Sequence, residues 1–292
     1  MITLDHVAHF VPGADEASAA LARLGFTLTP FSEQSHRLRE DGPLVPAGTG
    51  NRCVMLEKGY IEFLTPIGDT PNAAQLRLAM QRYVGVHLVA FGTDAAPLDH
   101  LRLTKASFEP LEPIALQRRI STEKGEDTAR FTVVRVPPGA MAEGRIQYCQ
   151  HHTPELVWQT RWTSHANGAT GLAAVILCVE NPDEAAERYG RFSGLKWTAA
   201  GGARHLETAR GTLVFIDRGT LERTLGVSAP ALPWIAGYAL DCCSVEVAHN
   251  AAVTAGAVVR DLADGRFAVT LPDALGGVIV FQAPERGVVR FE

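Results

Sequence analysis

Four copies of one five-residue frame recur along the chain, and this repeat limits the fold more than any other feature. The frame consists of a glycine, any residue, Ile or Leu, a variable residue and an aromatic residue, and it starts at Gly59, Gly144, Gly211 and Gly277. Alternate side chains of a strand face opposite sides, so the variable residue points away from its aliphatic and aromatic neighbours. These variable residues are Glu62, Gln147, Val214 and Val280. The pattern predicts four copies of one unit, two of which keep a polar side chain.

Each frame closes a longer unit with the order strand, helix and three strands. In the first unit we expect a strand over 4–11, a helix capped by Asp15, a strand over 26–31, a polar loop over 32–50 and two further strands. The later units start near Val84, Leu172 and Tyr238. Glycines 25, 194 and 256 take the same place between helix and strand. A repeat supported at separate places predicts an α+β fold of four βαβββ modules, which form two domains with curled mixed sheets.

The polar stretch 163–171 is the best linker between these two domains. It predicts a first domain over 1–160 and a second over 170–292. A chain of 292 residues is long enough for two such domains to bury their own cores.

Composition excludes several classes of protein. The formal charge is −5 and the Lys and Arg residues are spread thinly, so no basic stripe is present for nucleic acid. We find neither a secretory signal nor an apolar run of membrane-spanning length, which predicts no membrane partner and a cytoplasmic location. The five cysteines include no C-x-x-C pair, and we expect them to be reduced and structural. The expected partner is a small molecule. The four units could pair either within one chain or across a homodimer.

The first strands of the units carry a second variable position. Aligning these strands by their last residues places His6, His87, Ala174 and Leu240 at equivalent sites. The first two units therefore combine two imidazoles with the carboxylate of Glu62 and the amide of Gln147. Such donors suit divalent zinc, nickel, manganese or iron, and paired units would bring them together by pseudo-symmetry. Taken singly, each histidine is more often a hydrogen-bonded structural residue.

With these residues in place, the chain resembles the vicinal oxygen chelate superfamily, which includes glyoxalase I, extradiol dioxygenases and fosfomycin-resistance proteins. The resemblance rests on the βαβββ repeat, the early histidine, and the runs Gly48-Thr49-Gly50-Asn51-Arg52 and Gly59-Tyr60-Ile61-Glu62. These two runs, one following the other, are similar to those of the glyoxalase-like domain proteins within the superfamily. The resemblance implies a glyoxalase fold with a metal cleft, a degenerate second domain without ligands, and the metal ligands His6, Glu62, His87 and Gln147.

The implied activity is that of a glyoxalase-like lyase or isomerase acting on a small carbonyl or vicinal-oxygen compound chelated to the metal. Gln147 departs from the carboxylate usual at that position, so Glu62 is the expected catalytic base. His9 and His151 are alternatives for the base and are expected to contact the substrate. Arg52 either binds an anionic or carbonyl group through its planar fork or pairs with an acid at the sheet rim.

Two other functions stay open. A two-histidine, one-carboxylate iron site would suit an extradiol-type dioxygenase, although dioxygenases of the superfamily take the carboxylate from the later unit, where this chain has Gln147. The other alternative is a non-catalytic protein that binds and sequesters a small molecule. In the leading hypothesis of a glyoxalase-like metalloenzyme, the C-terminal pair of units is a degenerate copy that is expected to line the cleft or to mediate dimer contacts.

Overall fold

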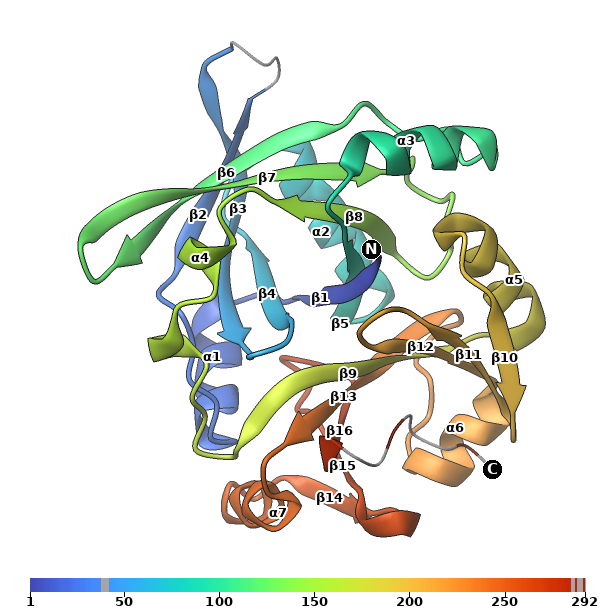
Figure 1. The fold of residues 1–292 in the computed structure, drawn as a ribbon. Helices are drawn as coiled ribbons and strands as arrows, with labels where there is room; N and C mark the ends of the chain where they lie inside the picture. Colours follow the sequence, from blue (N-terminus) through green and yellow to red (C-terminus); the bar gives the residue numbers. More distant parts are fainter. Residues whose placement is uncertain (38–41, 285–286, 288–290, 292) are drawn as a thin grey trace.

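The computed structural model of the chain describes residues 1–37, 42–284, 287 and 291 and shows an α+β fold (Figure 1). The first quarter contains β1 (Thr3–Phe10), α1 (Ala14–Arg23), β2 (Ser32–Arg37), β3 (Leu44–Met55) and β4 (Tyr60–Pro66). The second contains β5 (Gly85–Gly92), α3 (Ala96–Lys105), β6 (Ile114–Thr122), β7 (Gly125–Arg135) and β8 (Arg145–His151). Helix α2 (Pro71–Arg82) joins these two quarters.

The second half repeats this order. The third quarter contains β9 (Ala169–Cys178), α5 (Pro182–Ser193), β10 (Trp197–Ala200), β11 (Ala203–Glu207) and β12 (Thr212–Ile216). The fourth contains β13 (Trp234–Cys242), α7 (Val245–Thr254), β14 (Val258–Asp261), β15 (Phe267–Thr270) and β16 (Val278–Gln282). The connecting elements are α4 (Pro154–Val157), η1 (Thr160–Trp162), α6 (Arg218–Leu225) and η2 (Ala263–Gly265).

All four quarters share one strand order. The first strand lies parallel to the last, and the third and second strands follow beside the last, as in β1-β4-β3-β2. The repeated frame therefore always lies next to the first strand of its own quarter. This arrangement places the variable residue of each frame beside a first-strand residue of the same quarter.

The first two quarters close into one eight-stranded mixed sheet. Strand β1 pairs with β5, and β2 pairs with β6, so the order β1-β4-β3-β2-β6-β7-β8-β5 returns to its start. Helix α2 packs against β1, β3 and β4, and its Leu76 joins the apolar side chains inside the closed sheet. The closed sheet therefore has an interior that can hold a ligand.

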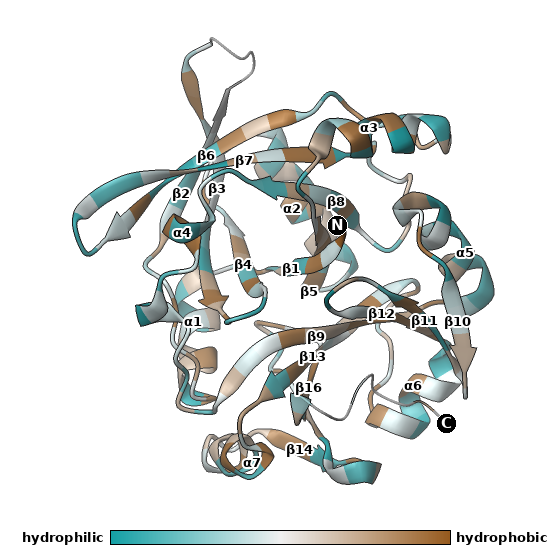
Figure 2. Cartoon of the chain, viewed as in Figure 1, coloured by the Kyte–Doolittle hydropathy of each residue, from teal (hydrophilic) through white to brown (hydrophobic). Residues whose placement is uncertain are grey.

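The last two quarters form an open extension of this sheet. Strand β13 pairs with β9, and in the described residues β10 and β14 do not pair with each other (Figure 1). The closed and open parts meet where Val86 of β5 pairs with Ile235 of β13. Figure 2 shows hydrophobic colour along β12 and hydrophilic colour along β2, which anticipates the difference between the two interiors.

The largest hydrophobic core lies on the outer face of the closed sheet, against the helices and the second half. It includes Val7, Phe63 and Phe91 from the first half and Phe215 and Phe281 from the second, each at most 1% exposed. Isoleucine, leucine and the aromatic of every frame point into such cores, because they alternate with the variable residue. Burial of this shared core holds the two halves together.

The glycines predicted between helix and strand are confirmed in both halves, because Gly25, Gly194 and Gly256 all have positive φ, whereas the predicted start of the first helix differs. Asn181 caps α5 with its side chain, and Gly194 ends that helix in the left-handed conformation. Helix α1 instead begins after Gly13 without a side-chain cap, and Asp15 lies in its first turn. The prediction that Asp15 caps this helix was wrong.

The second strand of the first unit is also displaced from its predicted place. Residues 26–31 form no strand, and β2 occupies part of the stretch that was expected to be a loop. The sequence of β2, Ser-Glu-Gln-Ser-His-Arg, lacks apolar alternation because Gln34 and Ser35 line an internal cavity. Polar lining hid the strand from a reading based on hydrophobic periodicity.

The predicted linker is tied to the first half. His165 donates from Nε2 to the carbonyl of Met55 at 2.8 Å and accepts from the Thr27 amide at 3.1 Å. Asn167 donates to the carbonyl of Leu24 at 2.9 Å.

In the described residues, no helix is long and apolar enough to cross a membrane.

Candidate functional site

A cavity of about 290 Å³ occupies the interior of the closed sheet. Its apolar wall comes from leucines of β4, α2, β5 and β6 together with Ile114, Phe131 and Val133. The polar groups that line it include His6, Gln34, Thr49, Asn51, Tyr60, Glu62, Gln117, Arg118, Arg135, Arg145, Gln147 and Cys149. An apolar enclosure with a few convergent polar groups is the usual form of a small-molecule site.

Glu62 is held inside this cavity by two amide side chains. Its Oε1 accepts from Gln34 Nε2 at 3.2 Å and from Asn51 Nδ2. Thr49 donates to the Oε1 of Gln34 at 2.7 Å and fixes the orientation of that amide. Two donors on Oε1 hold the carboxylate in place and leave Oε2 as the oxygen for a ligand.

Asp5 orients His6 from the neighbouring position on β1. The Asp5 Oδ2 accepts from His6 Nδ1 at 2.7 Å and from His151 Nε2 at 3.0 Å. Burial would raise the pKa of the Asp5 carboxyl, but His151 and His6 outweigh burial and hold this pKa well below its usual range. Because His6 Nδ1–H donates its hydrogen bond to Asp5, Nε2 is the nitrogen that a ligand in the cavity can use.

A β-bulge brings Asp5 to this place. The pairing of β1 with β5 passes from Leu4↔Phe91 to His6↔Ala90 and leaves Asp5 without a partner. An extra residue of this kind redirects a side chain, so neighbouring residues can meet on one side of the strand. The bulge thus explains how a residue next to His6 contacts it directly.

A second bulge places His87 outside the cavity. The pairing passes from Ala8↔Leu88 to His9↔Val86, so His87 is the unpaired residue of β5. Its Nε2 donates to the carbonyl of Tyr83 at 2.7 Å, and its ring stacks on Tyr83 at 4.0 Å between centroids. Burial lowers the pKa of His87 to about 4. The cavity-lining residues do not include His87.

The strand register shows why the sequence alignment misplaced this histidine. Glu62 lies beside Ala8, and Gln147 lies beside Ala90, so the two alanines are equivalent. Two residues earlier, His6 corresponds to Leu88, and His87 corresponds to Asp5. The alignment that equated His6 with His87 was therefore off by one residue, and a slip of one residue exchanges the two faces of a strand.

Of the four predicted ligands, His6, Glu62 and Gln147 line one cavity and His87 does not. In the part of the chain that the structure describes, these residues form no cluster of three close His, Cys, Asp or Glu donors. The cluster that does exist consists of Asp5, Cys149 and His151, whose donor atoms lie within 4.8 Å of one another. Metal binding by the predicted ligands stays a prediction.

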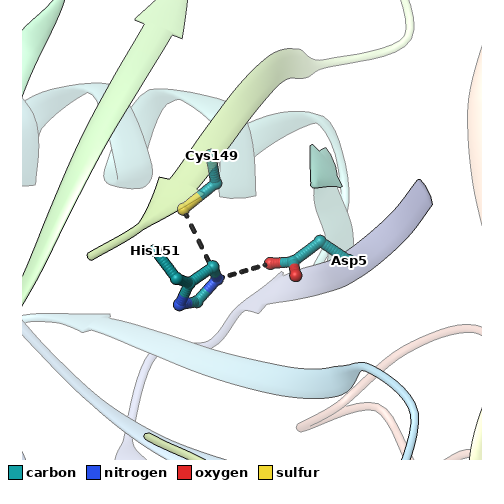
Figure 3. A group of neighbouring side chains, drawn as sticks. All are labelled: Asp5, Cys149 and His151. Atoms are coloured by element: carbon teal, nitrogen blue, oxygen red, sulfur yellow. Dashed lines mark hydrogen bonds and ion pairs between the residues drawn. The ribbon is translucent and has the colours of Figure 1, made fainter. Parts of the chain in front are cut away.

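Figure 3 shows Cys149 and Asp5 converging on His151. The Cys149 Sγ lies 3.7 Å from the same Nε2 that donates to Asp5, while His151 Nδ1 is buried without a hydrogen bond. Burial, followed by the charges of Asp5 and Glu62, raises the pKa of the Cys149 thiol well above its usual value. One nitrogen cannot both donate to Asp5 and take the thiol proton, so the three residues do not form a nucleophilic triad.

The other predicted contacts lie away from the cavity. His9 donates to the carbonyl of Leu275 at 2.8 Å and faces the hydroxyl of Tyr238 at 3.2 Å, between the two halves. Arg52 donates to the carbonyl of Thr29 at 3.3 Å and lies 4.0 Å from Asp15, which agrees with the alternative of a rim contact. None of the three residues predicted to contact the substrate, His9, Arg52 and His151, lines the cavity.

The sequence of residues 4–193, about two thirds of the chain, matches the family described as glyoxalase-like domain. The chain belongs to the glyoxalase-like domain family. The match begins at the second residue of β1, covers the rest of the closed sheet and continues through α5. No curated protein matches the chain in sequence.

Solved structures resemble this glyoxalase-like chain in fold. A hypothetical protein from Staphylococcus aureus matches with a TM-score of 0.62 and 11% identity, over 97% of this chain and 99% of the other. A mutant 4-hydroxymandelate synthase from Streptomyces coelicolor matches with a TM-score of 0.59 and 15% identity, over 99% and 94%. A xylose isomerase-like TIM barrel/4-hydroxyphenylpyruvate dioxygenase fusion protein gives 0.55 and 14%, over 99% of this chain and 50% of that one. At such identities the likeness shows the fold alone.

Several residues at the glyoxalase-like site were missed by the sequence analysis. Arg145 lies two residues before Gln147 on the same face of β8, so strand alternation alone could have found it. Arg135 of β7 is paired with Gln147 of β8, and the register of these two strands could not be derived from the sequence. Asp5 could not be found by alternation, because its bulge breaks the period.

Proposed function

We propose that this chain is a glyoxalase-like enzyme of the lyase or isomerase type that acts on a small carbonyl compound inside the closed sheet. One observation carries the proposal: His6, Glu62 and Gln147 line one cavity although they come from three strands. An imidazole, a carboxylate and an amide oxygen around an apolar enclosure can orient a carbonyl compound and move a proton on it.

The superfamily implies a divalent metal, and three of the predicted donors fit one. The hydrogen bond from His6 Nδ1 to the Asp5 carboxylate is the contact that usually orients a metal-bound histidine. We propose that His6, Glu62 and Gln147 hold the ion, with open positions for the substrate, as catalytic sites require. When bound, a divalent ion would polarise the substrate carbonyl. His87 does not fit this set, because its Nε2 donates to Tyr83.

The chain's own residues supply the proton transfer in this proposal. Glu62 accepts a proton from the carbon next to the carbonyl and returns it to complete an isomerisation. Asn51 and Gln34 keep its carboxylate directed into the cavity. Leucines 64, 76 and 88 line the cavity and limit the access of water.

The domain arrangement belongs to the same proposal. Residues 1–160 would form the catalytic glyoxalase-like domain, and residues 170–292 a degenerate one without metal ligands. The apolar residues Val214 and Val280, both 0% exposed, support this division. A homodimer, one of the two ways in which the units could pair, is also part of this proposal.

A dioxygenase is less well supported than a lyase or isomerase. A two-histidine, one-carboxylate iron site would need His87 beside His6 and Glu62, and its ring instead packs on Tyr83. A non-catalytic binding protein is the second candidate. It is favoured by Ala8 and Ala90, which offer no donor beside Glu62 and Gln147.

Elemental analysis of four variants tests the proposal. We expect about one equivalent of divalent ion per chain and a drop in affinity of roughly ten- to a hundred-fold for His6→Ala and Glu62→Gln. His87→Asn and Cys149→Ser should keep the wild-type content. A loss of the ion in Cys149→Ser alone would indicate that the ion binds at the group of Asp5, Cys149 and His151. A wild-type protein that takes up no ion and turns over no 2-oxoaldehyde would favour the binding protein.

A further inference from the structure

The cavity carries an excess of positive charge in a chain whose net charge is −5. Three arginines, Arg118, Arg135 and Arg145, line it beside a single carboxylate, that of Glu62. In the described part of the chain none of these arginines forms a salt bridge. A cleft lined by one sign of charge attracts molecules of the opposite sign.

Arg135 is the least satisfied of the three. Its side chain is half-buried and makes no hydrogen bond or ion pair with any residue that the structure describes, and its Nε is fully shielded from solvent. Burial lowers the pKa of Arg135. A buried donor without an acceptor, such as the Arg135 Nε, is costly, and buried polar groups are normally hydrogen-bonded. An anionic ligand would supply the missing acceptor.

Arg145 lies beside Arg135 on the next strand. Arg135 faces Gln147 in the register of β7 and β8, and Arg145 is two residues from Gln147 on the same face. Burial, and then the charge of Arg135, lower the pKa of Arg145 to about 10. Its Nη2 donates at 3.1 Å to the neutral amide of Gln75. The charge of Glu62 acts in the opposite direction on Arg145, but in the described residues neither arginine forms a salt bridge.

Arg118 occupies a different part of the cavity wall. It donates to Asn51 Oδ1 at 3.3 Å and lies over the ring of Phe131 at 5.8 Å. Through Asn51 it is linked to the group that holds Glu62. This arginine supports the site of Glu62. Arg135 has no hydrogen-bond or ion-pair partner among the described residues, and Arg145 contacts the amide of Gln75 and lies over the ring of Phe10 at 5.6 Å, but it pairs with no acid there.

We propose that Arg135 and Arg145 bind a carboxylate group of the substrate, so that the natural ligand is a small anionic carbonyl compound of the 2-oxo acid class. The carbonyl would then lie toward Gln147 and Glu62, which face the same cavity. The inference rests on the proposed use of this cavity as the substrate site. It requires neither turnover nor a bound metal, because guanidinium groups bind carboxylates directly through paired N–H donors.

Calorimetric binding of matched acids and amides tests the proposal. The probes are pyruvate, 2-oxobutyrate and 2-oxohexanoate, each compared with its uncharged primary amide of nearly the same shape, with EDTA present throughout. We expect at least one acid to bind about ten-fold or more tighter than its amide. Arg135→Met and Arg145→Met should each weaken acid binding by roughly ten- to a hundred-fold and leave amide binding unchanged.

Arg119→Met is the matched control. Arg119 lies on β6 with its side chain 83% exposed, and its replacement by Met removes the same charge as the other two substitutions. It should keep wild-type affinity. Arg135→Lys retains the charge and guards against misfolding, and it should recover part of the acid affinity. Equal binding of acids and amides, no binding of any acid, or equal effects of Arg119→Met and Arg135→Met would overturn the inference. Binding of acids without any metal uptake or turnover would refute the proposed enzyme and leave the carboxylate site in place.

Discussion

The two halves of the molecule use the same frame to opposite ends. In the closed sheet, Glu62 and Gln147 face a cavity that contains polar and charged groups. In the open sheet, the equivalent Val214 and Val280 face a compact apolar cluster that includes Leu221 of α6 and Phe291 near the end of the chain. One half therefore keeps an interior for a ligand, and the other has filled its own.

This difference teaches which part of the repeat carries the fold and which part carries the site. The glycine, aliphatic and aromatic positions build strands and cores in both halves, as the burial of Phe63 and Phe215 shows. The variable position packs against whatever occupies the other face. Function in such a fold depends on a few residues grafted onto a common scaffold.

Placing a carboxylate in the filled half should have the largest effect. Val214→Glu buries a charge among apolar side chains, without the amides that serve Glu62, and we expect a loss of about 4 kcal/mol or failure to fold. The measurement is urea unfolding followed by circular dichroism. Val214→Leu adds volume without charge, and a cost equal to that of Val214→Glu would show that crowding is responsible.

Breaking the buried ion pair between the halves should cost somewhat less. Glu143 is 1% exposed and accepts from Arg188 of α5 through both oxygens, at 2.8 and 2.9 Å. Arg188→Met leaves this carboxylate buried and unpaired, with an expected loss of about 3 kcal/mol. The double variant with Glu143→Gln should recover much of it. A double variant no more stable than Arg188→Met would mean that packing of the arginine, not its charge, joins the halves.

Acid should also weaken the contact between the two halves at His9, which bonds to Leu275 and Tyr238. Burial and the nearby His87 lower the pKa of His9 to about 4, against an ordinary value of 6.5, although the Leu275 carbonyl opposes this shift. The unfolded chain then binds the proton more readily, so stability is present above pH 6.5 and is lost as the pH falls toward 4. The loss amounts to roughly 3 kcal/mol once the pH is below 4.

Unfolding free energies measured between neutral pH and pH 4 test this dependence. His9→Gln removes the titrating group and should flatten the curve over that interval, while the exposed His152→Gln should not. His87, also lowered to about 4, contributes in the same direction, so a residual slope is expected in His9→Gln. A His9→Gln curve as steep as the wild type would place the acid-sensitive group elsewhere.

The sequence predicted the repeat better than it predicted the site. The order of elements along each unit followed from local patterns, and the end of α5 followed from Gly194, because short-range chemistry decides such features. Glu62 and Gln147 were found by strand alternation. His87 was misplaced and Asp5 was missed, since two bulges shift the register by one residue each. Arg135 stands out because its side chain has no hydrogen-bond or ion-pair partner among the described residues. That is a property of the three-dimensional structure and cannot be recognised from a sequence pattern.

The helix caps give the smallest and most local test of the comparison. Asn181 Oδ1 accepts from the amides of Asp183 and Glu184, so Asn181→Ala should cost about 1 kcal/mol. Helix α1 begins at Gly13, which has extended backbone angles and open space around a would-be Cβ. Gly13→Ser should therefore stabilise the chain by a few tenths of a kcal/mol. Thermal unfolding of the two variants should show opposite shifts, and a destabilising Gly13→Ser would mean that the first half needs its glycine for another reason.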